Sequence, residues 1–402
     1  MKRICIVIPE GLPVPAVRGG AIETLIQQVI DINEVEKKSS FTIICSEDQN
    51  AIKLSREYKY TNFFFIPYKE KSKIQHSKEL VCRTIKKIAH VEAYAKPRYM
   101  KTVENFILDN QADFDYVVNE SYSLLGMKRI SEILGKEKLV AHLHCYVKAT
   151  EQLESIYGTI VTVSDYIKKK WLETAKSSTT KVIVVKNGIE QKKFECEMSQ
   201  NQVNEIQKQL GICEDDFVVL YCGRIVPQKG VKELIEAILR INNNKIKLLI
   251  IGSPKFGLKA KSSYMDKIKQ YVEEYPDIIK FTGFIHNTEL YKYYAISSVS
   301  VIPSTYEDPA PLVPIEGMAN GIPLIVTNTG GAWEYVSEEC ALRVIKEENL
   351  VEQIAESIVS LMHNADKQKM MRIAAKNRAK LFTSGQFYTD FIEMLKGLDK
   401  KS

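Results

Sequence analysis

Several features that would define a class of protein are missing from these 402 residues. No apolar run approaches the roughly 20 residues that a membrane-spanning helix needs, so we do not expect an integral membrane protein. The eight cysteines include no CxxC pair, and Cys5, Cys45 and Cys222 lie in apolar runs typical of buried strands. We therefore expect reduced thiols, with no disulfide and no zinc site.

Nucleotide-binding motifs of the best-known kinds are also absent. There is no GxGxxG, which counts against an NAD enzyme, and no GxxxxGK[ST], which excludes a Walker loop. No RNP-like or helix-turn-helix pattern is present, so we expect no nucleic-acid partner. The opening MKRICIVIPEG has only a short apolar run before Pro9, which favours a first strand over a signal peptide and predicts a cytoplasmic protein.

The net charge of +6 is concentrated in one segment. Between Tyr68 and Lys101 there are ten Lys or Arg against three Glu, and apolar residues recur among them at roughly helical spacing. A basic amphipathic helix of this kind could rest on anionic lipid headgroups, which predicts peripheral contact with the inner face of a membrane. The solvated face of a core helix explains the pattern equally well.

Short β-branched runs alternate with helix-patterned segments along the whole chain. The first half contains KRICIVIP, FTIICS, FFFIPY, DYVVNE, LVAHLH, TIVTVS and VIVVKNG, and the second contains FVVLYCG, KLLIIG, IIKFTG, VSVIPS and LIVTNT. This rhythm predicts an α/β protein with two doubly wound, Rossmann-like units. The polar stretch 192–216 carries no strand pattern, so we place the junction near 187–200, with domains at 1–190 and 191–381.

Doubly wound sheets bind ligands at the carboxyl ends of their strands, and two facing units would form a cleft. The most informative stretch is EDPAPLVPIEGMANGIPLIVTNTGG at 307–331, in which Asp308 and Glu316 are separated by seven residues. A helix beginning there would offer unpaired N–H groups to a phosphate, while the carboxylates would take hydroxyls. The stretch suits a sugar nucleotide, although an ordinary capped helix is the alternative.

Two further loops follow predicted strands. Arg224 and Lys229 lie in GRIVPQKG after FVVLYCG, where a guanidinium fork and an ammonium group suit a diphosphate. Gly19 and Gly20 follow the first strand and could let the backbone approach a ligand closely. Exposed cations and an ordinary turn are the alternatives.

His142 and His144 end the strand LVAHLH on one face, with no third metal ligand evident nearby. We expect His144 to line the cleft and to bond a sugar hydroxyl, a satisfied buried histidine being the alternative. Asp113-Phe114-Asp115 spells a DxD metal motif, but it precedes a strand, and we interpret it as a decoy.

Together these residues resemble the retaining glycosyltransferases of family four, which share the two-domain GT-B fold, and the resemblance covers nearly the full length. Its motifs are Gly19-Gly20, His144, the VSxxI-like segment 163–167, Asn187-Gly188, Arg224 with Lys229, FTGFI at 281–285, Pro303-Ser304 and the run from Glu316 to Gly331. The opening LPVPAVRGGAIET is similar to the branch that includes spore-coat and surface-polysaccharide enzymes.

The resemblance implies transfer of a sugar from a nucleoside diphosphate sugar, UDP by family analogy, to a glycan or lipid-linked acceptor with retention. It implies neither a metal nor another cofactor, and a segment 382–402 that packs back on the first domain. It assigns catalytic roles to His144, Asp308, Arg224 and Lys229. The donor site would use Gly19, Gly20, Arg224, Lys229, Ile285, Ala310, Leu312, Val313 and Glu316.

The sequence departs from the family pattern at the first acid. Asp308 stands there with Glu307 beside it as a rival, and DPAPL replaces an EPFGL-like run, so Pro309 and Pro311 offer no N–H. Two other hypotheses stay open: a sugar-nucleotide epimerase or hydrolase of the same fold, and a non-catalytic scaffold or coat protein, which this departure makes conceivable. Retained Arg224, Lys229 and Glu316 argue against a scaffold.

Overall fold

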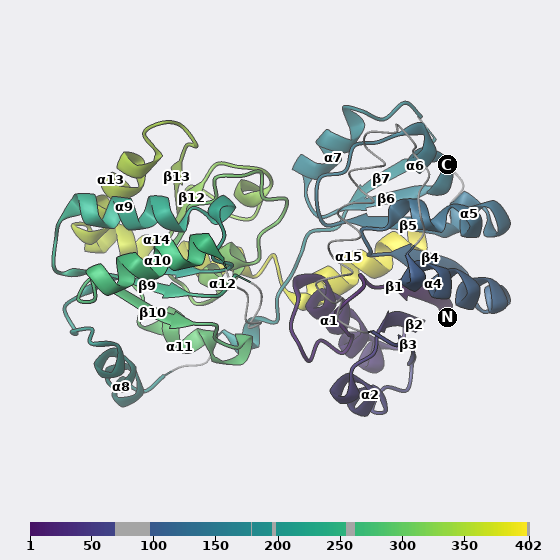
Figure 1. Ribbon diagram of the computed structural model, residues 1–402, viewed down its shortest axis with the longest axis horizontal. Coiled ribbons are helices and arrows are strands. Elements are labelled where there is room, and N and C mark those ends of the chain that lie inside the picture. Colours follow the sequence, from purple (N-terminus) through teal and green to yellow (C-terminus); the bar gives the residue numbers. More distant parts are fainter. Residues whose placement is uncertain (69–96, 178, 195–197, 255–261, 400–402) are drawn as a thin grey trace. The chain divides into compact units, whose positions relative to one another are not determined.

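The computed structural model describes residues 1–68, 97–177, 179–194, 198–254 and 262–399 (Figure 1). The chain forms two compact units. Unit 1 comprises 1–162, 170–183 and 392–402, and unit 2 comprises 163–169 and 184–391. Each unit contains one sheet, with seven strands in unit 1 and six in unit 2.

Unit 1 alternates strands and helices from its first residues. Its strands are β1 (Lys2–Val7), β2 (Ser39–Ser46), β3 (Thr61–Ile66), β4 (Tyr116–Asn119), β5 (Leu139–Leu143), β6 (Thr159–Thr162) and β7 (Lys181–Val184). Its helices are α1 (Ala21–Glu36), α2 (Gln49–Ser55), α4 (Arg98–Asp109), α5 (Lys128–Leu134) and α6 (Glu151–Ile156), and α7 (Asp165–Leu172) leads from β6 toward β7.

The sheet of unit 1 has the order β3-β2-β1-β4-β5-β6-β7, and its neighbouring strands from β3 through β6 run parallel. The chain builds outward from β1 to β3 and then returns to place β4 on the other side of β1. Every residue of β5 and β6 is buried, which is typical of parallel strands covered on both faces. The order reverses between β1 and β4, and their carboxyl ends form the switch point where such sheets bind ligands.

Unit 2 repeats the plan with different loops. Its strands are β8 (Phe217–Cys222), β9 (Ile246–Ile251), β10 (Ile279–Gly283), β11 (Val299–Ile302), β12 (Leu324–Thr327) and β13 (Ala341–Val344). Its helices are α8 (Gln200–Leu210), α9 (Val231–Ile241), α10 (Ser263–Glu274), α11 (Leu290–Ala295), α12 (Val313–Ala319), α13 (Leu350–Met362) and α14 (Ala365–Ala379), followed by α15 (Ser384–Gly397).

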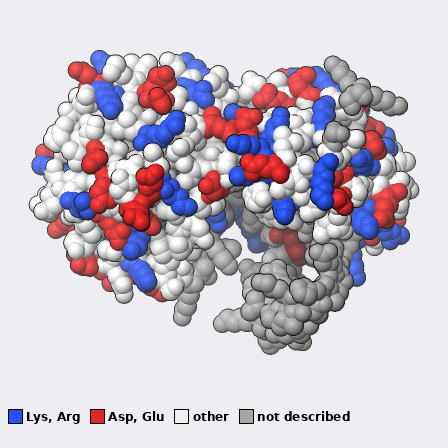
Figure 2. Space-filling model, turned by 90° about the horizontal axis from the view of Figure 1, so that it is seen from above, with Lys and Arg blue, Asp and Glu red and all other residues white. Residues whose placement is uncertain are grey.

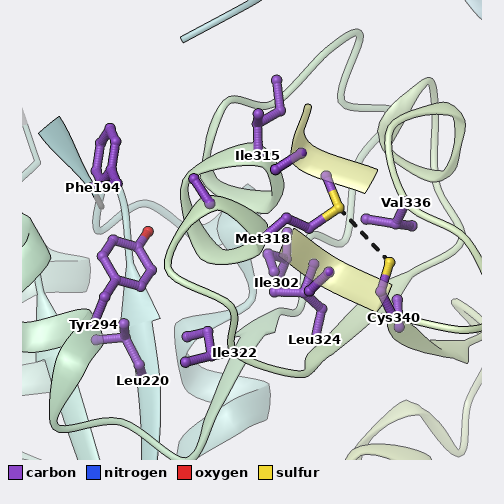
Figure 3. Packing of buried hydrophobic residues seen from close by; sticks show 14 of the residues in the cluster. Phe194, Leu220, Tyr294, Ile302, Ile315, Met318, Ile322, Leu324, Val336 and Cys340 are labelled. Atoms are coloured by element: carbon purple, nitrogen blue, oxygen red, sulfur yellow. Dashed lines mark hydrogen bonds between the residues drawn. The ribbon is translucent and has the colours of Figure 1, made fainter. Parts of the chain in front are cut away.

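The sheet of unit 2 is parallel throughout, in the order β10-β9-β8-β11-β12-β13. Helices cover both faces because each carries one apolar stripe; α9, for example, buries Val231, Leu234, Ile235 and Ile238. One core lies beneath α9, α10 and α13, and the other contains Tyr294, Ile315, Met318 and Cys340 (Figure 3). The switch point of this sheet lies between β8 and β11.

The last turn of α15 belongs to unit 1. Lys2 at the start of β1 donates to the carbonyl of Leu395 and pairs with Asp399 at 2.8 Å, and Tyr116 of β4 donates to the same carboxylate at 2.7 Å. Lys181 of β7 donates to the carbonyl of Gly397 at 3.1 Å. The two ends of the chain are therefore joined by side chains from three strands of unit 1.

The predicted fold class is confirmed: both halves are doubly wound α/β units. All twelve strand patterns read from the sequence correspond to β1 through β12. β13 was not predicted, since ALRV is short and contains a charged residue, Arg343. Unit 2 consists of 184–391 together with 163–169, whereas the sequence analysis placed domain boundaries after residues 190 and 381.

Candidate functional site

The carboxyl edge of the unit 2 sheet collects most of the predicted donor-site residues. Arg224 and Lys229 follow β8, Asp308 follows β11, and the neighbouring loop after β12 carries Gly330 and Gly331. Because β8 and β11 are adjacent parallel strands, these loops meet at the switch point. The structure thus brings together residues that are about 80 positions apart in the chain.

The loop after β8 holds its two cations differently. The Arg224 side chain is exposed and forms no ion pair with any described residue, while its carbonyl accepts a hydrogen bond from Tyr221 at 2.7 Å. Lys229 is half-buried at the end of a short 3₁₀ turn, Pro227–Lys229. Gly230 then adopts φ +70°, and a Cβ there would lie 1.8 Å from the carbonyl oxygen of Pro303. The loop after β8 therefore packs directly against the backbone that follows β11.

Lys229 points to Asp308. Its Nζ contacts the Asp308 carboxylate and lies 5.1 Å from the centre of the Tyr306 ring. Asp308 is 5% exposed, whereas Glu307 is exposed and accepts a hydrogen bond from the N–H of Gly330 at 3.1 Å. Of the two rival acids, Asp308 is the one that faces the cation of the β8 loop.

The DPAPL run is fixed by backbone contacts. The carbonyl of Asp308 accepts from the N–H of Gly331 at 2.8 Å, and an added Cβ at Gly330 would lie 2.2 Å from that carbonyl oxygen. The side chain of Asn187 donates to the carbonyl of Ala310 at 3.2 Å. These contacts explain why two glycines end the motif: any side chain there would collide with the acidic loop.

The remaining predicted donor residues of unit 2 lie close to its core. Ile285, Ala310, Leu312 and Val313 are partly buried against the core cluster that contains Tyr294. Helix α12 begins at Val313, between Asp308 and Glu316 as the sequence predicted, and has only seven residues. Because their side chains pack inward, a ligand would contact the backbone of these residues.

Glu316 lies on α12 inside this core. It is 8% exposed, and its Oε2 accepts a hydrogen bond from the hydroxyl of Tyr294 on α11 at 3.1 Å. Burial raises the pKa of Glu316 to about 7, and the Tyr294 bond offsets only part of that rise. Figure 3 shows the Tyr294 ring beside Phe194, and their ring centres are 6.2 Å apart. No sequence pattern singled out Tyr294, which is one of four tyrosines between residues 291 and 306.

In unit 1, the predicted glycine pair precedes α1. Gly19 and Gly20 adopt φ +74° and +107°, which only glycine adopts readily. A Cβ on Gly20 would lie 2.1 Å from Oε2 of Glu23, so the glycine leaves room for this carboxyl group. Glu23 is 4% exposed, and burial, together with the charge of Glu120, raises its pKa to about 7 despite a bond from its own N–H.

His144, also in unit 1, has a partner that the sequence did not reveal. Glu120, the first residue after β4, places Oε2 2.5 Å from Nε2 of His144 and 3.0 Å from Nδ1 of His142. No third ligand near the two histidines was evident from the sequence, and the structure places the Glu120 carboxylate beside both rings. Glu120 could have been predicted from its position directly after the strand YVVN. The strands β4 and β5 are neighbours, so residues that follow them at the carboxyl edge lie close together.

Glu120, His142 and His144 have the composition of a metal site. Their ligand atoms lie within 4.8 Å of one another. However, ligands about 2.0–2.2 Å from a tetrahedral zinc ion would stand roughly 3.3–3.6 Å apart, and two of these separations are shorter. The distances fit hydrogen bonds. The other group of potential ligands, Cys213, Asp215 and Asp216, lies at the surface, and Asp215 contacts Lys245.

The DxD sequence lies before β4, as expected from its place in the chain. Arg3 of β1 pairs with Asp115 at 2.8 Å and approaches Asp113 at 4.0 Å. These acids are therefore engaged with a cation at the amino end of the sheet, opposite the edge that carries Glu120 and His144. The six cysteines described are all free thiols.

Residues 69–96, which hold most of the basic segment, lie outside the described residues. Within the described part of the chain, no helix is long and apolar enough to cross a membrane. Figure 2 shows side chains of both signs interspersed over the face in view. A membrane-binding surface therefore stays a prediction.

The chain matches known proteins along most of its length. The family described as Glycosyl transferases group 1 matches residues 202–378, which include Arg224, Lys229, Asp308 and Glu316. YtcC of Bacillus subtilis, a glycosyltransferase by name, is 27% identical over 396 residues, covering 95% of this chain and 88% of YtcC. Spore coat protein SA of the same species is 25% identical over 376 residues, 92% of each chain.

A solved structure shows the same architecture. Anabaena Alr3699/HepE in complex with UDP-glucose has a TM-score of 0.74 to this chain, covering 99% of it and 100% of the Anabaena chain, at 16% identity. At that identity the likeness shows the fold alone. With the two doubly wound sheets of the GT-B fold, the match of residues 202–378 to the group 1 glycosyl transferases confirms the predicted resemblance to glycosyltransferase family four.

Proposed function

We propose that this protein transfers a sugar from a nucleoside diphosphate sugar, with UDP as the nucleotide, to a hydroxyl group of a glycan or lipid-linked acceptor. The observation that carries the proposal is the pair of cations after β8 at the switch point, with the Asp308 carboxylate beside Lys229. The Anabaena structure, which has the same fold, holds UDP-glucose, and this supports the choice of nucleotide.

The unit 2 residues divide the donor between them. Arg224, which is exposed and has no ionic partner among the described residues, is placed to take diphosphate oxygens in a bidentate contact. Lys229 would exchange part of its contact with Asp308 for phosphate, leaving Asp308 to accept hydroxyls of the sugar. Glu316, held by Tyr294, would accept the hydroxyls of the ribose.

The chemistry needs charge stabilisation at the leaving group. The bond between the anomeric carbon and the diphosphate oxygen breaks, a bond to the acceptor oxygen forms, and the acceptor proton passes to a phosphate oxygen of the departing diphosphate. Arg224 and Lys229 would stabilise the negative charge that develops there, a contribution commonly worth 10²–10³ in rate for one donor group. We propose that the reaction proceeds with retention and without a metal, as the family resemblance implies.

The biological setting is part of the same proposal. Relatives include Spore coat protein SA and the Staphylococcus aureus capsular polysaccharide biosynthesis glycosyltransferase CapM, which is 27% identical over 282 residues. These names support a role in the synthesis of a coat or surface polysaccharide. We propose action in the cytoplasm, at the inner face of the membrane, with segment 68–101 contacting anionic lipid.

Thermal unfolding with a panel of nucleotides tests the donor site. A ligand at 100 times its Kd stabilises the folded state by about 2.7 kcal/mol. We expect UDP and one UDP-sugar to raise the Tm, GDP to have no effect, and Arg224→Ala to abolish the shift. Arg240→Ala is the matched control, because this exposed arginine of the same unit pairs with Glu352 at 2.8 Å, away from the switch point.

Transfer is then measured with the sugar nucleotide that binds. Release of UDP that depends on an added glycan or lipid-linked acceptor, with an α-linked product from an α-linked donor, supports the proposal. Release that is independent of acceptor would favour a hydrolase or epimerase. A protein that binds no nucleotide and still assembles normally in a coat would be a scaffold.

A further inference from the structure

Glu120 lies between two imidazole rings in unit 1. Its side chain is fully buried, as is that of His142, and the two histidine rings are 4.3 Å apart between centres. One carboxylate oxygen lies 2.5 Å from Nε2 of His144, and Nδ1 of His142 lies 3.0 and 3.1 Å from the two oxygens. Both rings therefore turn one particular nitrogen toward a single carboxylate.

The charge state of Glu120 settles which nitrogens carry hydrogen. Burial alone would raise its pKa, but the two histidines outweigh burial and lower the pKa to about 2. An ionised carboxylate only accepts hydrogen bonds. Nδ1 of His142 and Nε2 of His144 must therefore be the protonated nitrogens, since otherwise two lone pairs would face each other at hydrogen-bonding distance.

This assignment leaves Nδ1 of His144 as a bare acceptor. Burial and the neighbouring His142 lower the pKa of His144, so its ring is neutral near pH 7. The side chain of His144 is 8% exposed, and Nδ1 has no hydrogen-bond partner among the described residues. A neutral imidazole protonated on Nε2 accepts a hydrogen bond at Nδ1 and cannot donate one there.

We propose that Glu120 is a positioning residue that fixes His144 with Nδ1 as the acceptor for a sugar hydroxyl, at the carboxyl edge of unit 1. This rests on the proposed transfer function and specifies what unit 1 recognises: a group that donates a hydrogen bond, such as a hydroxyl, rather than a phosphate oxygen. Glu23 is a second buried carboxyl group that interacts with Glu120, and it too makes the binding of an anion at this edge less favourable. The hydroxyl belongs either to the acceptor or to the transferred sugar.

Glu120→Gln tests the assignment with little change in volume. A glutamine keeps one acceptor oxygen and replaces the other with an NH₂ group that donates, so an imidazole nitrogen that faces the NH₂ group must present a lone pair. We expect kcat to fall by 10- to 100-fold while the UDP-induced rise in Tm, which reports on unit 2, stays unchanged. Glu104→Gln is the control, because Glu104 is a buried carboxylate of the same unit that lies 3.4 Å from Arg129.

Imidazole ¹⁵N NMR reads the tautomer directly and does not depend on turnover. In the wild type we expect the His144 signals of an Nε2–H ring, and in Glu120→Gln a shift toward the Nδ1–H form. Each of three results overturns the inference: an Nδ1–H or charged His144 in the wild type at pH 7.5, unchanged kcat in Glu120→Gln, or one equivalent of zinc in the purified wild type that Glu120→Gln loses.

The source of the hydroxyl follows from the kinetics of Glu120→Gln. A raised KM for the acceptor assigns it to the acceptor, and a raised KM for the sugar nucleotide assigns it to the transferred sugar. Failure of the proposed function is distinguishable, because then the wild type itself would neither bind UDP nor transfer sugar, whatever the NMR signals of His144 show.

Discussion

The two units place an acid beside the same topological switch and give it different partners. In unit 1 the order reverses between β1 and β4, and Glu120 after β4 is held by two imidazoles. In unit 2 it reverses between β8 and β11, and Asp308 after β11 contacts the ammonium of Lys229. One scaffold thus supports an edge with neutral and acidic groups and an edge with two cations.

The difference assigns the two edges to different chemistry. Under the proposed function, Arg224 and Lys229 would attract a diphosphate to unit 2, whereas Glu23 and Glu120 would repel one from unit 1 and favour hydroxyl donors. The division is made by loops, because the strands beneath them are almost uniformly apolar and buried. Substitutions at these loops should therefore affect the two units in opposite or unequal ways.

The largest effect is expected from Gly230→Ala in the β8 loop. Alanine at φ +70° is strained, and its Cβ would lie 1.8 Å from the backbone oxygen of Pro303, which cannot rotate away. We expect a loss of about 3 kcal/mol in unfolding free energy by urea denaturation, together with loss of the UDP-induced Tm shift. Gly283→Ala is the control, because φ is +78° but nothing lies within 4 Å, so only the conformational cost of about 1–2 kcal/mol applies.

The equivalent change in unit 1 should cost less. A Cβ on Gly20 would meet the Glu23 side chain, which can rotate, and not backbone. If Gly20→Ala proves as destabilising as Gly230→Ala, the glycine loop of unit 1 is more rigidly built than these contacts indicate. If Gly230→Ala costs no more than Gly283→Ala, the β8 loop moves freely and is not a preformed diphosphate site.

A second effect concerns pH and has opposite sign in the two units. The pKa of Glu316 is raised to about 7 from an ordinary 4.5, so its contribution to stability is full below pH 4.5 and is lost as pH rises through 7. The pKa of Glu120 is lowered to about 2, so its contribution is full above pH 4.5 and is lost as pH falls toward 2. Each of these changes in pKa corresponds to a free energy on the order of 3 kcal/mol.

Urea denaturation across pH separates the two carboxyl groups. Glu316→Gln should be more stable than the wild type at pH 8 and equal to it at pH 4.5, because glutamine resembles the protonated acid. Glu120→Gln should be less stable than the wild type at pH 7, with the difference shrinking below pH 4. Glu307→Gln serves as the control, since this acid is exposed and should change neither profile by more than about 0.5 kcal/mol. Parallel profiles for the two buried acids would contradict the comparison.

The parallel sheets could be predicted from the sequence, but the contacts among side chains at their carboxyl edges could be predicted only in part. Runs such as FVVLYCG and VSVIPS mark strands unambiguously, and the rule that ligands bind after strands led directly to Arg224, Lys229 and Asp308. The sequence could not choose between Asp308 and Glu307, because that choice depends on which side chain faces Lys229 across 79 residues.

The roles of Glu120 and Tyr294 as hydrogen-bond partners were not predicted, for the same physical reason. Their roles come from neighbouring strands or helices, so they are visible only once the register is known. Asn119 of β4 pairs with Ala141 of β5, so the residues that follow them, Glu120 and His142, lie side by side. Tyr294 meets Glu316 only because α11 and α12 both pack on one side of the sheet, within the same core.

Tyr294→Phe should have the smallest effect and the most specific one. The hydroxyl of Tyr294 donates to Oε2 of Glu316 at 3.1 Å, and without it the carboxylate loses one anchor and the pKa of Glu316 rises further. A single hydrogen bond of this kind is worth about 1 kcal/mol, which corresponds to roughly fivefold in UDP affinity. Isothermal titration with UDP and 2′-deoxy-UDP measures it.

The wild type should prefer UDP over 2′-deoxy-UDP. Tyr294→Phe should lose part of that preference, because the carboxylate of Glu316, which we propose accepts the ribose hydroxyls, is no longer held. Tyr293→Phe is the matched control, since it removes the same hydroxyl group one residue away on α11 and leaves the bond to Glu316 intact. Equal losses for UDP and 2′-deoxy-UDP would mean that Glu316 acts through packing alone, and the ribose would then have to be recognised by other residues of unit 2.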